Sequence, residues 1–180
     1  MRIAFLMAPE GVEQVELTRP WQAVQDAGDE PVLVSTEPGR VQAFRHLDRG
    51  DTFPVQEVVG DTSADAFAGL VLPGGVANPD RLRMHAGAVS FVRDFFTQGR
   101  PVAAICHAPW TLVEADCVRG RVLTSWPSLR TDIINAGGTW VDEQVQVCEQ
   151  GNNLLITSRK PADLDAFCET FVREFGRASV

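Results

Sequence analysis

The chain has 180 residues, a length that favours one globular domain over residues 1–180. Hydrophobic residues make up 44% and charged residues 22%, a composition that excludes a disordered chain. Its 24 acidic and 16 basic residues give a net charge of -8. Because nucleic-acid binding needs clustered Lys and Arg, this scattered and acidic balance argues against a nucleic-acid partner.

The first third of the chain predicts two buried strands, a helix and a hairpin. Residues 2–7 and 31–36 are short apolar runs typical of buried parallel strands. Residues 12–28 between them carry apolar side chains at helical spacing, interrupted by Pro20 and stopped by a glycine. Residues 40–59 alternate polar and apolar about Arg49-Gly50-Asp51, which predicts an antiparallel hairpin at the sheet edge.

The rest of the chain continues the alternation of strands and helices. Buried strands are predicted at 68–75, 101–106 and 121–125, and an alternating pair at 144–149 and 153–158. Helices are predicted at 85–99, from Ala108-Pro109 onward, at 129–138 and at 162–176. Right-handed crossovers place such helices on both faces of a parallel sheet. We therefore expect a flavodoxin-like, doubly wound α/β fold with a mainly parallel sheet and an edge hairpin.

Cys106 is the candidate nucleophile. It ends the predicted strand 101–106 just before a helix, where a sharp turn points the side chain out of the sheet and free N–H groups face it. The helix dipole there is expected to lower the thiol pKa. The other cysteines, Cys117, Cys148 and Cys168, are expected to be buried core residues.

Five further residues carry weaker signals, each with a structural alternative. His107 either works with the thiol, which needs a strained turn, or is a surface histidine. Gly74-Gly75 either offers N–H groups to an oxyanion or simply forms a turn. Glu13 and Glu16 open a predicted helix, where acids ordinarily complement the dipole. His46 and His85 are expected at the surface.

The cysteine pattern and the N-terminus bear on the compartment. Four widely spaced cysteines with no CxxC pair indicate reduced thiols. The first apolar run breaks at Pro9 and Glu10, too early for a membrane span or a secretion signal. We expect a cytoplasmic protein with no membrane partner. Three scattered histidines and isolated cysteines predict no metal site and no cofactor.

Several separated motifs resemble the PfpI family of intracellular cysteine proteases and deglycases. They are LVLPGGVANPDRLR, GRPVAAICHAPWTLVEA, RGRVLTSWPSLRTDIINAGGTWVDE and SRKPADLDAFCETFVREF, in this order along nearly the whole chain. The wider superfamily includes the Parkinsonism-associated protein deglycase and glyoxalase III. The resemblance implies a homo-oligomer, a dimer or a hexamer.

The resemblance assigns roles residue by residue. It implies that Cys106 is the nucleophile, that Glu13 is the buried carboxyl bonded to its sulfur, and that the N–H groups of Gly75 and His107 form the oxyanion hole. It also implies that Asp80 of a neighbouring subunit orients His107. The family commonly has Glu at the position of Asp80 and Gly at that of Ala108. Asp80 could instead cap the segment DRLR.

Three functions compete at this stage. The first is a stress-protective hydrolase of glyoxal or methylglyoxal, or of their protein adducts, and the second is a cysteine peptidase. The third is a redox sensor or holdase chaperone in which Cys106 is oxidised. A class I glutamine amidotransferase is excluded because no histidine follows position 107. Gly74, Trp110 and Trp126 are expected to line the pocket, although both tryptophans could equally be core aromatics.

Overall fold

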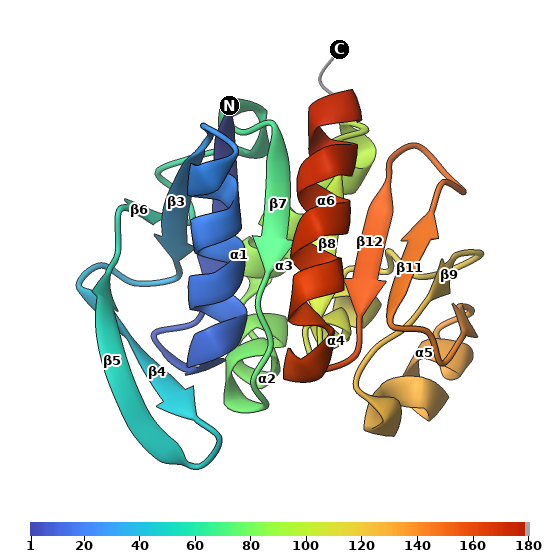
Figure 1. The fold of residues 1–180 in the computed structure, drawn as a ribbon, viewed down its shortest axis with the longest axis horizontal. Helices are drawn as coiled ribbons and strands as arrows, with labels where there is room; N and C mark the ends of the chain where they lie inside the picture. The colour runs from blue at the N-terminus through green and yellow to red at the C-terminus, as the bar shows by residue number, and fades with distance from the viewer. Residues whose placement is uncertain (179–180) are drawn as a thin grey trace.

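A seven-stranded sheet forms the centre of residues 1–178, the part of the chain that the computed structural model describes (Figure 1). Its strands are β1 Arg2–Met7, β3 Glu30–Ser35, β6 Glu57–Val58, β7 Gly69–Leu72, β8 Val102–Ile105, β11 Val145–Cys148 and β12 Leu155–Ser158. They lie in the order β11-β12-β8-β7-β1-β3-β6, and only β11 runs antiparallel to its neighbour. The predicted flavodoxin-like fold is confirmed.

Helices cover both faces of this sheet. Helix α1, Gln14–Asp26, and helix α6, Leu164–Ala178, lie side by side on one face, while α3, Ala86–Thr97, and the short α2, Ala77–Arg83, and α4, Pro109–Glu114, lie behind the sheet (Figure 1). Helix α5, Arg130–Asn135, packs beside the two-residue strands β9, Val122–Leu123, and β10, Thr139–Trp140. The helices on opposite faces bury the central strands β7, β8 and β12, as a parallel sheet requires, while the edge strands β6 and β11 stay partly exposed.

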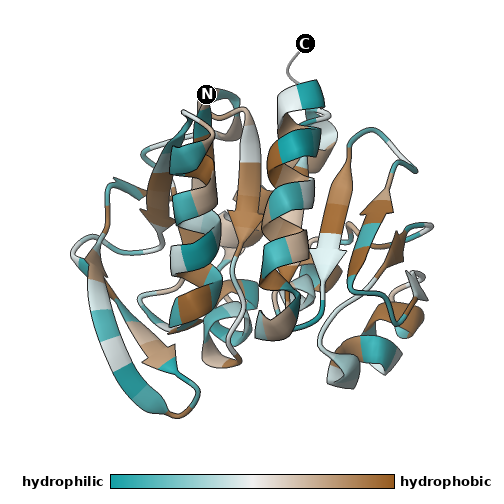
Figure 2. Cartoon of the chain, viewed as in Figure 1, coloured by the Kyte–Doolittle hydropathy of each residue, from teal (hydrophilic) through white to brown (hydrophobic). Residues whose placement is uncertain are grey.

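Strand β1 shows how the chain fills two cores at once. Ile3, Phe5 and Met7 pack with α1 and α6, whereas Ala4 and Leu6 pack with α3 on the other face. Successive side chains of a strand point to opposite faces, so a strand buried on both sides must be apolar at every position. In Figure 2 most of β7 and the body of β12 are accordingly brown, although β12 turns pale at its arrowhead, while the two front helices alternate brown and teal.

The edge hairpin forms as predicted, but its turn lies elsewhere. Strands β4, Arg40–Arg45, and β5, Asp48–Pro54, pair antiparallel and turn at His46-Leu47, not at residues 49–51. His46 takes the left-handed φ of 61°, and Gly50 lies within β5. A Cβ at Gly50 would meet the Gln14 side-chain oxygen at 2.2 Å, so this glycine serves a close approach and not a turn.

Two short elements escaped the sequence patterns, and a third is shorter than predicted. Strand β2, Glu10–Glu13, pairs with β4 and brings the hairpin against the start of α1. Helix α2 has no apolar periodicity long enough to detect. The predicted strand at 121–125 shrinks to β9, which pairs with β10 outside the central sheet. Each of these elements depends on tertiary contacts for its stability.

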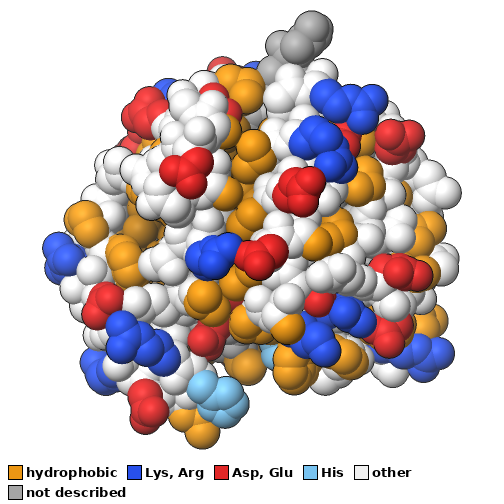
Figure 3. Space-filling view, in the orientation of Figure 1, with side chains coloured by type: hydrophobic (Ala, Val, Ile, Leu, Met, Phe, Trp, Pro, Cys, Tyr) orange, Lys and Arg blue, Asp and Glu red, His pale blue; other side chains and the backbone are white. Residues whose placement is uncertain are grey.

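Charges of both signs alternate over the face shown in Figure 3, and no large single-sign patch interrupts them. Within residues 1–178, no helix has both the length and the apolar composition needed to cross a bilayer.

Phe171 of α6 offers a direct test of the packing. It is fully buried between Phe167 and Phe175, with ring centroids 5.2 Å and 5.4 Å away. Phe171→Ala is expected to lower the free energy of unfolding by about 3–5 kcal/mol, because it leaves a cavity among aromatic rings. Urea denaturation measures this loss. Glu169 is exposed on the same helix, and Glu169→Ala should change the free energy of unfolding by no more than about 0.5 kcal/mol. Equal losses for the two variants would contradict the burial of the Phe171 face of α6.

Candidate active site

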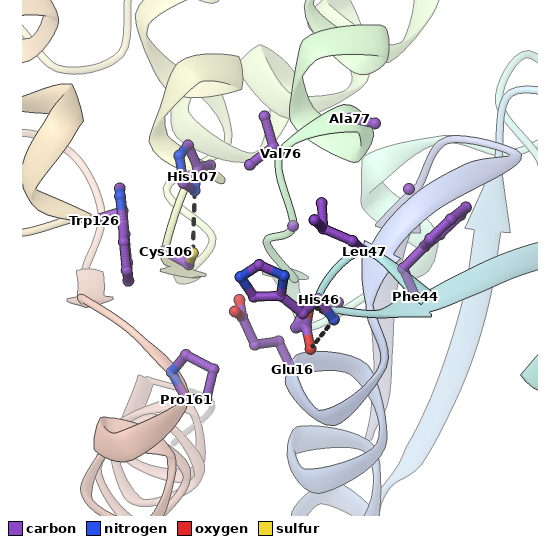
Figure 4. Close-up of a pocket in the computed structure, with 13 residues that line it drawn as sticks. Glu16, Phe44, His46, Leu47, Val76, Ala77, Cys106, His107, Trp126 and Pro161 are labelled. Atoms are coloured by element: carbon purple, nitrogen blue, oxygen red, sulfur yellow. Dashed lines mark hydrogen bonds between the residues drawn. The ribbon is translucent and has the colours of Figure 1, made fainter. Parts of the chain in front are cut away.

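A cavity of about 460 Å³ opens beside the carboxyl ends of the central strands (Figure 4). Six segments of the chain contribute to it: the β2–α1 junction, the hairpin tip, the β7–α2 loop, the β8–α4 turn, the residues after β9 and the residues after β12. Its walls are Gly11, Glu13, Glu16, Phe44, His46, Leu47, Gly75, Val76, Ala77, Cys106, His107, Trp126 and Pro161. Ligands of doubly wound folds bind at this end of the sheet.

Cys106 lies at a strained turn between β8 and α4. Its φ is 63°, in the left-handed region that costs a non-glycine residue about 1–3 kcal/mol. Two backbone hydrogen bonds hold this conformation: its N–H donates to Ser158 O at 3.1 Å, and its carbonyl accepts from Trp126 N–H at 2.9 Å. The thiol therefore projects into the cavity from a fixed backbone, which is the geometry of a nucleophile elbow.

The strained turn brings the neighbouring histidine onto the sulfur. The distance from Cys106 Sγ to His107 Nδ1 is 3.2 Å, although adjacent side chains ordinarily diverge (Figure 4). The imidazole stacks on Trp126 with a centroid separation of 5.7 Å, and Trp110 meets it edge-on at 5.2 Å. Burial lowers the pKa of His107, so its ring is neutral at physiological pH. A neutral ring nitrogen at this distance can accept the thiol proton.

The carboxyl beside the sulfur belongs to Glu16, not to Glu13. Glu16 is buried in α1, hydrogen-bonds Cys106 and accepts the N–H of Gly74 at 3.1 Å. Glu13 also lines the cavity, but its carboxylate accepts the backbone N–H of His46 at 3.1 and 3.2 Å. The prediction for Glu13 is therefore wrong. Because β2 extends to Glu13, helix α1 begins at Gln14, two residues later than predicted, and its buried face carries Glu16.

The Glu16 carboxyl is protonated at neutral pH. Burial raises the pKa of Glu16 to about 8, with a smaller contribution from the charge of Glu13, whereas its hydrogen bonds to Cys106 and Gly74 act in the opposite direction. A protonated carboxyl can donate a hydrogen bond to the sulfur, which an ionised one cannot. Glu16 thus sits poised to hold or release one proton beside Cys106.

The Cys106 thiol is harder to ionise than the sequence suggests. Burial raises the pKa of the thiol, and Glu16 raises it further once Glu16 is ionised, while the N–H groups of His107 and Gly75 lower it. The expectation of a pKa below that of a free thiol is wrong for this enclosed site, because loss of hydration outweighs the two N–H groups. The proton must therefore leave through a neighbouring base, and His107 is in place to take it.

The loop after β7 fits tightly against the sulfur. A Cβ on Gly74 would lie 2.4 Å from Glu16 Oε2 and 2.7 Å from the Cys106 Cβ, so only glycine fits. Gly74 does not line the cavity as expected, because Glu16 and Cys106 pack directly against it. Gly75 has a φ of 80° and aims its N–H at the sulfur together with that of His107. Both N–H groups lie within hydrogen-bonding reach of the sulfur and favour its ionised form.

Asn78 supports this loop and was missed in the sequence. It is fully buried in α2, where its Oδ1 accepts the Ala8 N–H at 2.8 Å. Its Nδ2 donates to the carbonyls of Pro73 and Gly74 at 3.0 and 3.1 Å. The amide therefore ties the end of β1 to the glycine loop. An isolated asparagine in the segment GGVANPD gives no sequence signal for such a role.

The remaining predicted residues divide between the cavity and its surroundings. Trp126 lines the cavity, while Trp110 lies outside it behind His107, where its Nε1 donates to Asp132 at 2.9 Å. His46, expected simply at the surface, is exposed but also lines the cavity at the hairpin tip. Asp80 is exposed on α2 and is absent from the cavity wall.

The chemistry available here is that of a thiol, an imidazole and a carboxyl. Within residues 1–178, no three His, Cys, Asp or Glu side chains approach closely enough to hold a metal ion. His85 caps α3, its Nδ1 accepting the Ala88 N–H at 3.1 Å. Cys117, Cys148 and Cys168 are buried and free, as predicted.

Comparison with known proteins agrees with this geometry. Residues 1–174 match the DJ-1/PfpI family. The chain is 41% identical over 173 residues to Deglycase PH1704 of Pyrococcus horikoshii, a match that covers 96% of this chain and 98% of the relative. It is 35% identical over 175 residues to Protein/nucleic acid deglycase 2 of Escherichia coli, covering 97% and 98% of the two chains. YraA of Bacillus subtilis, whose name assigns it provisionally to the cysteine proteases, is 34% identical over 166 residues, covering 92% and 93%.

A solved structure matches the fold as well. A two-domain protein of Anabaena variabilis with DJ-1/ThiJ/PfpI-like and ferritin-like domains superposes with a TM-score of 0.88 and 32% identity. The match covers 97% of this chain and 48% of that protein, so this chain spans about half its length.

The proton on Glu16 should make stability depend on pH. Its pKa rises from 4.5 to about 8 on folding. Between these values the unfolded chain loses this proton while the folded chain keeps it, so stability falls by about 1.4 kcal/mol per pH unit as pH rises. Glu16→Gln, which carries no proton to lose, should flatten this part of the profile.

Urea denaturation of both proteins from pH 4.5 to 9 measures the difference. The matched Glu13→Gln variant should retain the slope of the wild type, because Glu13 bonds the hairpin and not the sulfur. Parallel profiles for Glu16→Gln and the wild type would show that Glu16 is ionised in the folded protein.

Proposed function

This chain belongs to the DJ-1/PfpI family, and from that premise we propose that it is a cysteine hydrolase that removes reactive dicarbonyls. Its substrates are glyoxal, methylglyoxal or their adducts with proteins, and its role is protection against carbonyl stress. The observation that carries this proposal is the convergence of Cys106, His107 and Glu16 on one enclosed cavity. The deglycase names of two relatives support the substrate class.

The first step is addition of sulfur to an aldehyde. Cys106 Sγ attacks the aldehyde carbon while its proton passes to His107 Nδ1, 3.2 Å away. The oxygen of the former carbonyl takes up the negative charge and is held by the N–H groups of Gly75 and His107. Return of the proton from His107 to this oxygen gives a neutral hemithioacetal.

The second step moves hydrogen between the two carbons of the dicarbonyl. A proton leaves the carbon bonded to sulfur, an enediol forms, and a proton returns to the neighbouring carbon, giving a 2-hydroxy thioester. Glu16 is the carboxyl beside the sulfur, and with a pKa of about 8 it is ionised in about a tenth of the molecules at pH 7. This carboxylate takes the proton from the carbon bonded to sulfur and returns it to the neighbouring carbon. Water then cleaves the thioester, releasing a hydroxy acid and restoring the thiol without any external oxidant.

The alternative function is a peptidase in which the same thiol attacks an amide. The provisional protease name of YraA favours it as the runner-up. Amide cleavage demands that an acid protonate a poor amine leaving group, and His107 has no carboxylate partner within residues 1–178. Small carbonyl substrates make no such demand, so the isolated chain fits the first function better.

We further propose that the chain acts in the cytoplasm as a homo-oligomer in which Asp80 reaches His107 of a neighbouring subunit. The side chain of Asp80 makes no hydrogen bond or ion pair within residues 1–178, and helix α2 begins at Ala77, so Asp80 is not its N-cap. Val76 and Met84, at the two ends of α2, are exposed apolar residues. An interface over α2 would bury them and bring Asp80 toward a partner.

The substrate class is decided by a paired assay. Wild-type protein is expected to consume methylglyoxal and to leave casein intact, and Cys106→Ala should lose methylglyoxal turnover by at least about a thousandfold. Cys148→Ala, which removes a thiol at the far edge of the sheet, should keep it. Casein cleavage that depends on Cys106 would favour the peptidase. Inactivity on both substrates, with Cys106 oxidised to a sulfinate, would favour a redox sensor.

The neighbouring acid is tested by mixing variants. Cys106→Ala and Asp80→Ala subunits, exchanged in one solution, should form some sites with an intact thiol from one chain and an intact acid from the other. Activity of the mixture is then expected to exceed that of either variant alone. Wild-type turnover by Asp80→Ala, or an active monomer in sedimentation at assay concentration, would exclude this role for Asp80.

A further inference from the structure

A second cavity, of about 390 Å³, lies near the amino ends of strands β8 and β12. Cys106 lies at the opposite, carboxyl ends of these two strands. Cys106 follows β8 and its N–H donates to Ser158, the last residue of β12. The second cavity is walled by the end of α3, the segment after α4 and the loop that precedes β12. We call it the arginine pocket, for Arg93, Arg119 and Arg121 in its wall.

The arginine pocket is cationic in a protein of net charge -8. Its ionisable lining comprises three guanidiniums and the carboxylate of Asp116, with the Cys117 thiol beside them. Burial raises the pKa of Cys117 to about 11, so this thiol is neutral at physiological pH. Asp116 pairs with Arg119 at 3.4 Å. Two positive charges are left without a counter-charge in the wall.

Arg121 is the anchor of the pocket. It is 7% exposed, and its terminal nitrogens donate to the Asn153 carbonyl at 3.0 Å and to the Asn153 side chain at 2.5 Å. Its guanidinium also lies 5.0 Å from the centre of the Phe96 ring. All these partners are neutral, and no carboxylate of residues 1–178 forms an ion pair with it. A buried cation without a counter-charge is costly, and an anion in the cavity would relieve that cost.

Arg93 presents free donors to the same space. Its Nε donates to the Ala115 carbonyl at 3.1 Å, and this bond fixes the side chain against the wall. Its two terminal nitrogens make no hydrogen bond to residues 1–178.

The loop before β12 covers Arg121. Gly151 in this loop has a φ of 92°, and a Cβ there would come within 2.6 Å of a terminal nitrogen of Arg121. The loop therefore rests directly on the buried guanidinium.

We propose that the arginine pocket binds a small organic phosphate monoester, with its phosphate held by Arg93, Arg119 and Arg121. A phosphate monoester carries about two negative charges at neutral pH, which matches the two uncompensated guanidiniums. Guanidinium groups bind phosphate oxygens in paired hydrogen bonds. The cavity is of the size that holds a small metabolite and is larger than inorganic phosphate needs. The Phe96 and Thr97 side chains are left to contact the organic part.

Isothermal titration calorimetry with glycerol 3-phosphate and glucose 6-phosphate tests the proposal on the intact protein. The wild type should bind at least one of them, while glycerol and glucose should not bind. The double variant Arg93→Gln/Arg119→Gln should weaken binding by about tenfold or more, because it removes charged donors to the phosphate. Both arginines are exposed, so the variant should fold and melt as the wild type does.

The matched control is Arg49→Gln/Arg130→Gln, which removes two exposed arginines whose side chains make no hydrogen bond or ion pair within residues 1–178. It should leave the affinity unchanged. Cys106→Ser should also bind normally, which separates this site from the proposed catalysis. Equal weakening by both double variants would reduce the effect to general electrostatics and overturn the proposal.

Two other outcomes would also overturn it. If neither ester binds and the Arg93→Gln/Arg119→Gln variant changes the oligomeric state in sedimentation, the cavity receives acidic side chains of a second copy. If neither ester binds and the same variant loses affinity for a single-stranded oligonucleotide, the cavity belongs to a nucleic-acid surface.

Discussion

The left-handed backbone of Cys106 is the constraint on which the site depends. A φ of 63° at a residue with a Cβ is unfavourable by itself and persists because both of its peptide groups are tied to neighbouring segments. One tie reaches the end of β12 and the other reaches Trp126. In a relaxed turn, the side chains at 106 and 107 would diverge, and the 3.2 Å contact between sulfur and imidazole would be lost.

Burial then decides the protonation states around this turn. It raises the pKa of the Cys106 thiol, raises the pKa of Glu16 and lowers the pKa of His107. All three groups are therefore mainly neutral at rest, with protons on the sulfur and the carboxyl and with His107 Nδ1 facing the sulfur. A neutral resting site costs less to bury than a thiolate–imidazolium pair and forms its charges only when a carbonyl arrives to receive the sulfur.

The family resemblance and the local patterns gave much of this picture. The apolar runs at 2–7 and 101–106 are continuous because parallel strands are buried on both faces, and that signal is local. The position of Cys106 between a strand and a proline-opened helix is equally visible in the letters. Alternation of polar and apolar residues predicts the hairpin. It does not predict where the hairpin turns, because Gly50 is typical of a turn but here makes room for the Gln14 side chain.

The sequence by itself determined the doubly wound fold, the place of Cys106 between a strand and a helix, and the glycine loop, since these follow from runs of neighbouring residues. Only the tertiary structure decided which acid serves the sulfur, because Glu13 and Glu16 differ in orientation through the length of β2, a strand that exists by pairing with β4. It likewise decided the role of Asn78 and the burial of Arg121, whose partners lie 70 and 32 residues away along the chain. Packing between distant segments sets burial, and burial sets the charge each group can carry.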